Sequence, residues 1–195
     1  ERYGTDLLQA LQALDKAGIV HRDIKPANLG VRESRGDRTK HLVLFDFSLA
    51  RAPGTATEAG TPPYLDPFLG TEGRQQYDSA AERYAAAVVL YEMATGHTPT
   101  YGDGTAHPAS ISDDVHLTTQ AFDSAVAKDL IAFFAKALAR NTSDRHHTAA
   151  QMLREWEAAF PESLTTIPDD ADDLAKSVTL ATPLTKAGLS AREGL

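Results

Sequence analysis

The sequence contains no cysteine, and this excludes three kinds of chemistry. Disulfide bonds, a thiolate nucleophile and a zinc–thiolate site all require the sulfur of that residue. Long hydrophobic runs are also missing, since the longest lie near residues 84–91 and 130–134 and fall far short of a bilayer span. We see no signal-peptide pattern either. We therefore expect a cytoplasmic protein with no membrane partner.

An excess of positive charge is absent as well. The chain has 19 Lys and Arg residues against 27 Asp and Glu residues, and its formal net charge is −8. Surfaces that bind nucleic acids are generally basic, so we expect no nucleic-acid partner for this region. The hydrophobic content of 42% is ordinary for a globular domain.

The length of 195 residues supports one domain with a tail. We expect the domain over residues 1–160. Prolines and an acidic run at 169–173 predict a linker with a short helical tail over 161–195, and residues 182–193 faintly resemble the start of a helix-hairpin-helix module. The chain begins at Glu1 inside a helical pattern, so we expect it to be a piece of a longer protein.

Hydrophobic periodicity predicts a mainly α-helical domain. Leucines at helical spacing predict a helix over residues 5–17, with Gly18 as its C-cap. Apolar residues predict further helices over 78–94 and 123–139, and Thr148 is the expected N-cap of a last one.

Polar residues around a predicted hairpin suit phosphoryl transfer. The β-prone runs 29–31 and 41–45 predict a hairpin with Asn28 at one end and Asp46 at the other, so both could reach one metal ion. Transfer to a hydroxyl requires a carboxylate that orients the hydroxyl and oxygen ligands that hold magnesium. Asp23 suits the first task, and Asn28 and Asp46 suit the second. The alternative is a polar loop without chemistry.

Two strings carry a family resemblance. Residues 21–28 read His-Arg-Asp-Ile-Lys-Pro-Ala-Asn, and residues 46–48 read Asp-Phe-Ser. They resemble the catalytic loop H-R-D-x-K-x-x-N and the metal-binding D-F-G of eukaryotic-type Ser/Thr protein kinases. The resemblance implies the C-terminal lobe of the kinase fold, which is helical with a small β-hairpin carrying the catalytic and metal residues.

The resemblance also implies a role for each polar residue of these strings. Asp23 orients the hydroxyl of a protein substrate, and Lys25 steadies the γ-phosphate of ATP. Asn28 and Asp46 bind Mg²⁺. His21 is structural and holds the loop by packing and hydrogen bonding. A lysine at the position of Lys25 is the family mark of Ser/Thr rather than Tyr preference.

Residues 49–67 resemble the activation segment of these kinases. Small residues dominate the segment, so it requires something to order it. Arg22, directly before the catalytic aspartate, could pair with a phosphate added to Thr55 or Thr57. The alternative is that these threonines are ordinary polar groups of a loop.

The end of this segment, Gly-Thr-Pro-Pro-Tyr-Leu-Asp-Pro-Phe at 60–68, resembles the kinase pattern G-T-P-x-Y-x-A-P-E. By that resemblance Thr61 hydrogen-bonds near Asp23 and Lys25. It would thereby help to shape the site for the acceptor hydroxyl.

Several positions depart from the kinase pattern. Ser48 stands where glycine is usual, and Glu82 stands where an aspartate holds the catalytic-loop backbone. Phe68 replaces a glutamate that pairs with a later arginine, at the position of Arg145. An unpaired buried guanidinium is costly, so we expect Arg145 to pair with Asp66. The alternatives are that Glu82 is a surface acid and that Arg145 is exposed.

The small lobe of the kinase fold has no counterpart before His21, since no Gly-rich loop, strand lysine or partner glutamate fits there. We expect the C-terminal lobe of a parent Ser/Thr kinase, with the missing N-terminal lobe as partner. This chain alone is expected to be inactive and to bind Mg·ATP poorly.

Two alternatives to a protein kinase remain. A pseudokinase scaffold is suggested by Ser48, Phe68 and Glu82, and a small-molecule phosphotransferase shares the Asp, Asn and Asp pattern. The alanine-rich composition and the ending at 64–68 also resemble, more loosely, large kinases of bacterial phage-defence systems.

Overall fold

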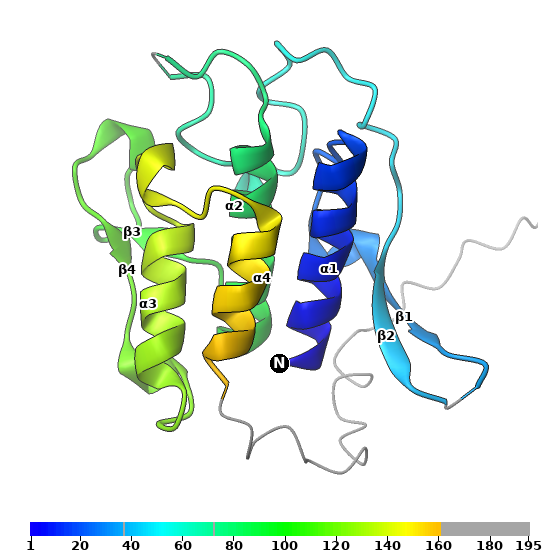
Figure 1. Cartoon of the computed structure of the whole chain (residues 1–195). Helices are drawn as coiled ribbons and strands as arrows, with labels where there is room; N and C mark the ends of the chain where they lie inside the picture. The colour runs from blue at the N-terminus through cyan, green and yellow to red at the C-terminus, as the bar shows by residue number, and fades with distance from the viewer. Residues whose placement is uncertain (37, 72, 161–195) are drawn as a thin grey trace, which may run out of the picture. The chain divides into compact units, whose positions relative to one another are not determined.

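The computed structural model describes residues 1–36, 38–71 and 73–160. The helices in this part are α1 (Arg2–Ala17), α2 (Ser79–Thr95), α3 (Ala127–Ala137) and α4 (Ala149–Ala158). The strands are β1 (Leu29–Glu33), β2 (Lys40–Leu44), β3 (Thr100–Tyr101) and β4 (Val115–His116) (Figure 1). The prediction of a mainly helical domain is confirmed. The predicted tail over 161–195 lies outside the described residues.

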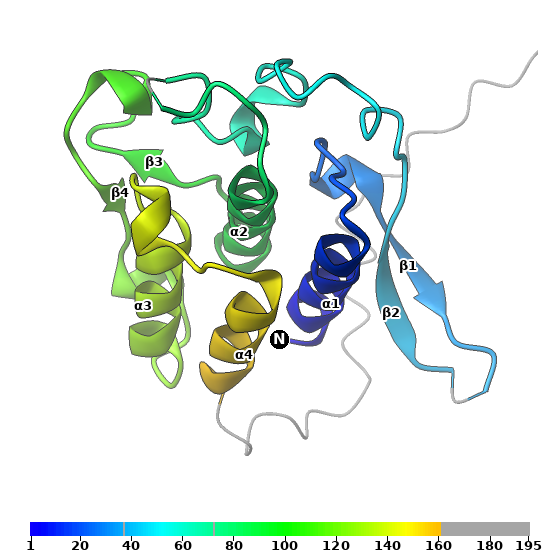
Figure 2. The ribbon, with the colours of Figure 1, turned by 45° about the horizontal axis from the view of Figure 1, so that its top comes forward.

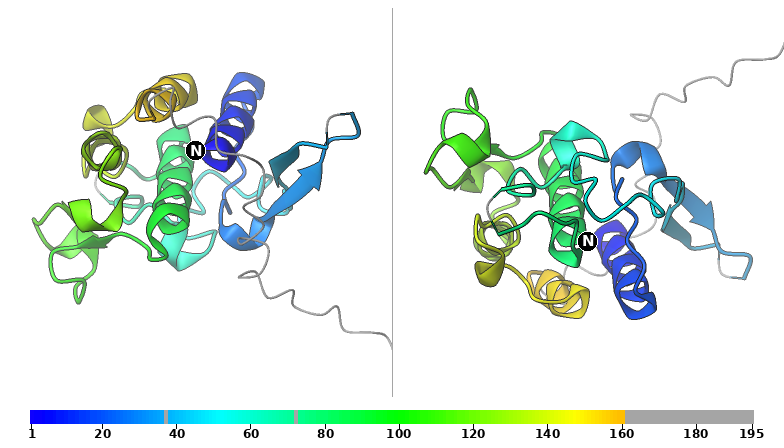
Figure 3. Two further views of the ribbon diagram at one scale, coloured as in Figure 1. Left: turned by 90° about the horizontal axis from the view of Figure 1, so that it is seen from below. Right: turned by 90° about the horizontal axis from the view of Figure 1, so that it is seen from above.

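Helix α2 forms the centre of the core. All of its residues from Ala80 to Tyr91 are buried, so this stretch presents no polar face to solvent. Both α1 and α3 pack against α2 and against α4. Figure 2 and Figure 3 show α2 lying between α1 on one side and α3 on the other.

A close contact with α4 holds the N-terminal part of α1. A Cβ atom on Gly4 would lie 2.4 Å from the Trp156 ring, so a larger residue cannot replace this glycine without movement. The Trp156 indole donates a hydrogen bond to the Glu1 carbonyl at 3.3 Å, and the Phe133 ring packs edge-on against it at 5.3 Å. Helices α1, α3 and α4 are thereby joined at the N-terminal end of α1.

The hairpin of β1 and β2 is antiparallel, with Leu29 opposite Leu44. Helix α1 covers its β2 side, where Asp6 Oδ2 accepts the Leu42 N–H at 2.8 Å. Beyond the strands, the Phe45 N–H donates to the Asn28 carbonyl at 3.0 Å. This bond extends the pairing to the end of the hairpin where Asn28 and Asp46 are expected to work together.

The helix ends follow their capping residues. Gly18 ends α1 in the left-handed conformation at φ 64°, and Thr148 accepts the Gln151 N–H at 3.1 Å to open α4. The prediction of a helix from residue 123 is wrong, because α3 begins at Ala127. Asp123 instead caps a tight turn, in which its Oδ1 accepts the Ala125 N–H at 2.9 Å.

Across the described residues, the structure contains no helix with the length and apolar character required to cross a bilayer.

Candidate active site

The carboxylate of Asp23 is held by three neighbouring side chains. Thr61 Oγ1 donates to Asp23 Oδ1 at 2.8 Å. Lys25 Nζ lies 2.7 Å from Oδ2 and also donates to Thr61 Oγ1 at 2.8 Å. Asn28 Nδ2 donates to Oδ2 at 2.9 Å and to the Asp23 carbonyl at 2.8 Å. The predicted contact of Thr61 with Asp23 and Lys25 is confirmed.

These contacts set the charge of Asp23. Partial burial favours the neutral acid and pushes its pKa upward. Hydrogen bonds from Lys25, Thr61 and Asn28, together with the Lys25 charge, outweigh burial, and the pKa of Asp23 falls below its ordinary value. The group is therefore a carboxylate at neutral pH. A carboxylate can orient a hydroxyl and accept its proton.

Asn28 and Asp46 stand at the adjoining ends of the hairpin. Both hydrogen bonds of the Asn28 side chain use its amino nitrogen, so its carbonyl oxygen remains the end suited to a cation. Asp46 is exposed, with a left-handed backbone at φ 64°. No cluster of three or more His, Cys, Asp or Glu side chains occurs among the described residues. Two oxygen ligands fit Mg²⁺ that takes its other ligands from phosphates and water.

His21 connects the catalytic loop to the turn that carries Asp46. Its Nδ1 accepts the Asp23 N–H at 3.3 Å, which assigns the ring proton to Nε2. Nε2 then donates to the Phe45 carbonyl at 2.9 Å, and the ring packs edge-on against Phe47 at 4.6 Å. The prediction that His21 has a structural role is confirmed.

Glu82 holds the backbone of the catalytic loop from α2. Its Oε2 accepts the His21 N–H at 2.8 Å, and its Oε1 accepts the Arg22 N–H at 2.7 Å. Arg22 adopts a left-handed conformation at φ 70°, which is unfavourable for a residue with a side chain. The predicted reach of Glu82 to this backbone is confirmed, and the alternative of a surface acid is wrong, since Glu82 is 1% exposed.

Gly60 lies against the same loop from the activation segment. A Cβ atom on Gly60 would come within 2.8 Å of the Arg22 carbonyl oxygen. Its φ of 143° is also a conformation that a side chain disfavours. Glycine at this position lets Thr61 approach the catalytic loop.

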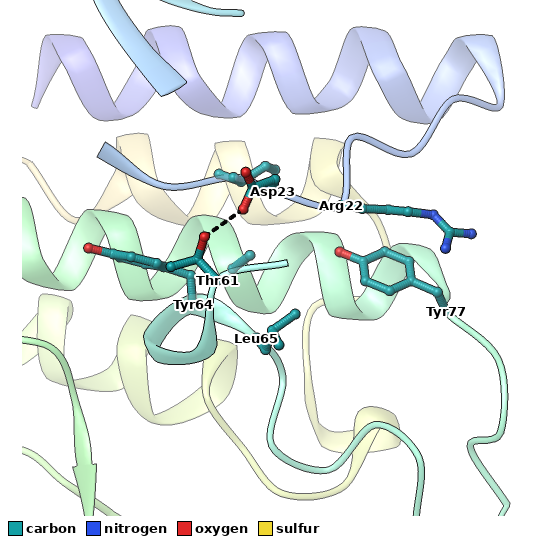
Figure 4. Close-up of a pocket in the computed structure, with 8 residues that line it drawn as sticks. Arg22, Asp23, Thr61, Tyr64, Leu65 and Tyr77 are labelled. Atoms are coloured by element: carbon teal, nitrogen blue, oxygen red, sulfur yellow. Dashed lines mark hydrogen bonds between the residues drawn. The ribbon is translucent and has the colours of Figure 1, made fainter. Parts of the chain in front are cut away.

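A small pocket lies behind Asp23 and Thr61 (Figure 4). Its lining comes from the catalytic loop, the end of the activation segment, α2 and the stretch just before α2, through Arg22, Asp23, Ile24, Thr61, Tyr64, Leu65, Tyr77 and Ala85. Tyr64 extends away from Asp23 and donates to Glu92 Oε2 at 2.8 Å. Burial and the Glu92 carboxylate raise the pKa of Tyr64 to about 12, so this donor stays protonated.

The structure does not bring Arg22 to the candidate phosphorylation sites. Arg22 Nη1 donates to the Pro53 carbonyl at 2.8 Å, and within the described residues no hydrogen bond joins Arg22 to Thr55 or Thr57. The Thr55 side chain is exposed, and Thr57 lies beside Gly70, where an added Cβ would come 3.3 Å from Thr57 Oγ1. The role of both threonines in regulation stays a prediction.

The end of the activation segment is fixed by a buried ion cluster. Arg145 donates to Asp66 Oδ2 at 2.5 Å and to Oδ1 at 3.2 Å, as predicted, and its side chain is 2% exposed. Arg74, which the sequence did not single out, adds a contact of 2.7 Å to Asp66 Oδ2 and bonds the helix cap Asp78. The Phe68 ring lies 5.8 Å from the Arg145 guanidinium carbon. Phe68 therefore packs against the ion pair of Asp66 and Arg145 without taking part in it.

Two residues that contact the buried acids near the site were not predicted from the sequence. Arg74 follows a Gly-rich turn without any motif, and Tyr77 precedes α2 where only its spacing of five residues from Glu82 marks it. Tyr77 donates from its hydroxyl to Glu82 Oε1 at 2.6 Å. The available signal was that a buried acid requires donors, and Arg74 and Tyr77 lie only eight and five residues from Asp66 and Glu82.

Known proteins resemble this chain over most of its length. The probable kinase PglW of Streptomyces coelicolor is 45% identical over 172 residues, covering 86% of this chain and 11% of that protein. The serine/threonine-protein kinase PknB of Mycobacterium leprae is 34% identical over 179 residues, covering 86% of this chain and 28% of PknB. The chain thus spans less than a third of the length of these relatives.

A third relative, the probable serine/threonine-protein kinase SCO3848 of Streptomyces coelicolor, is 35% identical over 166 residues, covering 79% of this chain and 23% of that protein. A family model described as the protein kinase domain matches residues 1–156, which carry the site described above. The chain belongs to the protein kinase domain family.

Proposed function

We propose that this chain is the catalytic C-terminal lobe of a bacterial Ser/Thr protein kinase. The longer protein would transfer the γ-phosphate of ATP to a Ser or Thr hydroxyl of a protein substrate. The observation that carries the proposal is the set of contacts around Asp23, in which Thr61 holds one carboxylate oxygen while Lys25 and Asn28 hold the other.

Asp23 would receive the acceptor hydroxyl and take its proton as the oxygen–phosphorus bond forms and the bond to ADP breaks. Thr61 and Asn28 fix the direction of the carboxylate before the substrate arrives. Lys25 places a positive charge 2.7 Å from Asp23, where it would steady the transferred γ-phosphate. Mg²⁺ held by Asn28 and Asp46 would neutralise the phosphates when bound.

The preference for Ser and Thr over Tyr is supported by two observations. Lys25 and Thr61 contact each other and Asp23, as the kinase resemblance implies for Ser/Thr enzymes. The names of PknB and SCO3848 carry the same specificity. Protein substrates, ATP and Mg²⁺ are proposed on the same basis.

A missing small lobe is proposed as the partner of the catalytic face. Large apolar side chains next to the site are between 45% and 57% exposed, namely Ile19, Val31, Phe45 and Phe47. Exposed apolar groups gathered near a functional site are typical of a surface that another part covers. The relatives, which are several times longer than this chain, have room for such a lobe.

A pseudokinase scaffold is the second candidate. It is favoured by Ser48, which replaces the usual glycine, and by Phe68, which replaces the usual glutamate. Two departures from the kinase pattern are compensated. Glu82, in place of the usual aspartate, bonds the loop backbone, and Asp66 pairs with Arg145 in place of the glutamate that Phe68 replaces. We therefore rank the active kinase first.

A cytoplasmic location and a link to phage defence are further proposals, the second supported by composition and by the ending at 64–68.

The direct test is phosphotransfer from radiolabelled ATP by the full-length protein. We expect Asp23→Asn to lower turnover by about 10²–10⁴-fold, because it removes the proton acceptor with little change of shape. Turnover within a few-fold of wild type would overturn the assignment. The 195-residue chain alone should not transfer phosphate, and calorimetric titration with Mg·ATP should detect at most weak binding. Micromolar binding that Asp46→Ala abolishes would contradict the need for a second lobe.

A further inference from the structure

Tyr77 contacts both the catalytic loop and the activation segment. Its hydroxyl donates to Glu82 Oε1 at 2.6 Å, and its backbone N–H donates to the Gly54 carbonyl at 2.8 Å. Its ring lies 4.8 Å from the guanidinium carbon of Arg22, and Figure 4 shows the two side chains next to each other. We propose that Tyr77 is a positioning residue that fixes the catalytic loop through Glu82 and Arg22. The proposal rests on the kinase function proposed above.

The Tyr77 hydroxyl completes the hydrogen bonds of the Glu82 carboxylate. Glu82 is 1% exposed, and a buried carboxylate requires hydrogen-bond donors in place of water. Oε2 accepts from the His21 N–H, whereas Oε1 accepts from both the Arg22 N–H and the Tyr77 hydroxyl. The Tyr77 hydroxyl therefore supplies one of three donors and, with the two backbone N–H groups, fixes the rotation of the carboxylate about its last bond.

That rotation determines the backbone next to Asp23. Arg22 holds a left-handed conformation at φ 70°, which costs free energy unless surrounding contacts enforce it. The Glu82 bond to the Arg22 N–H is such a contact. Without the Tyr77 hydroxyl, only the His21 and Arg22 N–H groups hold the carboxylate, and the placement of Asp23 becomes less rigid.

The Tyr77 ring packs against the Arg22 guanidinium. Arg22 is 6% exposed, and its Nε has no hydrogen-bond acceptor among the described residues. The electron-rich ring face of Tyr77 is a favourable partner for this desolvated cation. Arg22 Nη1 then reaches the Pro53 carbonyl, next to Gly54, which the Tyr77 N–H holds. The start of the activation segment is thus tied to the catalytic loop without a phosphate group.

The Tyr77 hydroxyl keeps its proton under all ordinary conditions. Burial, together with the Glu82 carboxylate, raises the pKa of Tyr77 well above its usual value. The hydroxyl is therefore always available as a donor to Glu82.

Tyr77→Phe in the full-length protein tests the inference, because it removes the hydroxyl but keeps the ring beside Arg22. We expect kcat to fall about tenfold, the factor typical of one hydrogen bond to a charged group, with the KM for ATP within twofold of wild type. Tyr91→Phe is the matched control, because Tyr91 is a buried tyrosine of α2 whose ring contacts are with Phe122 and Phe134. It should leave both constants unchanged.

A second measurement is independent of activity. In the 195-residue chain, Tyr77→Phe should speed hydrogen exchange of the His21 and Arg22 amides, which donate to Glu82, by about tenfold. Tyr91→Phe should not change the exchange of these amides. An inactive wild-type full-length protein would refute the kinase function, and the exchange data would still decide the role of Tyr77. Unchanged kcat in an active protein, or unchanged exchange of both amides, overturns the proposal.

Discussion

Asp46 and Asp66 stand near the two ends of the activation segment, in opposite surroundings. Asp46 is exposed, and its carboxylate accepts the Ser48 N–H at 3.2 Å within its own turn. The Asp66 side chain is fully buried, bridges Arg74 and Arg145, and accepts the Phe68 N–H at 3.0 Å. One carboxylate is left open to groups from outside, and the other is closed by the chain itself.

This difference distinguishes a carboxylate whose hydrogen bonds and ion pairs are all made within the chain from one that can still bind a ligand. Asp66 requires nothing further, because two guanidinium groups and a backbone N–H satisfy it. Asp46 is an exposed carboxylate on a left-handed backbone, and its oxygens can still bind a cation. We infer that the exposed end serves chemistry and the buried end serves stability, and substitutions at the two ends can test this.

The largest effect on activity is expected at the exposed end. Asp46→Ala removes a proposed magnesium ligand, so phosphotransfer by the full-length protein should fall by about 10³-fold or more. The unfolding free energy of the 195-residue chain should fall by only about 1 kcal/mol, because alanine lacks the hydrogen bond to the Ser48 N–H and tolerates the left-handed backbone less well than aspartate. Radiolabelled ATP and urea titration measure the two quantities. A loss of stability by Asp46→Ala of about 3 kcal/mol or more would break the comparison.

The largest effect on stability is expected at the buried end. Asp66→Ala leaves Arg74 and Arg145 without their shared carboxylate, and breaking a buried pair costs about 3–5 kcal/mol. The loss should appear in urea or thermal unfolding of the 195-residue chain. Asp46→Ala is the control, since it makes the same substitution at the exposed end. Equal stability of the two variants would contradict the assignment of Asp66 as an anchor.

The sequence predicted the contacts whose partners lie in recognisable motifs. Asp23, Lys25, Asn28 and Thr61 come together as expected because short strings and a hairpin fix their spacing. The pairing of Asp66 with Arg145 was predictable because a buried guanidinium requires an acid.

Arg74 and Tyr77 could not be predicted in the same way. They lie in an irregular stretch before α2, where no periodicity indicates which side chains turn inward. Their partners Asp66 and Glu82 are close in sequence, yet the contacts depend on how the activation segment folds back on α2. The start of α3 was misplaced for a related reason, because Asp123 favours a local side-chain turn over the helix.

Acid should destabilise the folded chain through a buried histidine. His146, next to Arg145, is 1% exposed, and burial lowers its pKa to about 4 although Glu155 lies 3.0 Å from its Nε2. Below about pH 6.5 the unfolded chain binds a proton that the folded chain does not, so the free energy of unfolding falls as the pH drops toward 4. The loss should reach about 3 kcal/mol near pH 4.

His146→Gln in urea titrations from pH 7 to pH 4 checks this expectation. The variant should lose the part of the pH dependence that His146 contributes, whatever its stability at pH 7. The exposed neighbour His147 provides the control, since His147→Gln should keep the wild-type slope. A His146→Gln chain with the wild-type slope would show that His146 does not titrate in the way its burial implies.

The smallest effect is expected for Ser48→Gly, which restores the usual kinase residue at the exposed end. The left-handed backbone of this turn belongs to Asp46 at φ 64°, and Ser48 does not share it, so glycine relieves no strain at position 48. Ser48 donates its backbone N–H to Asp46 Oδ1 at 3.2 Å, and glycine retains that N–H. We expect stability to change by no more than about 1 kcal/mol and activity of the full-length protein to stay within about threefold of wild type. A gain of tenfold or more would show that Ser48 restrains the metal-binding turn and would strengthen the pseudokinase alternative, because the exposed end would then be impaired by its own sequence.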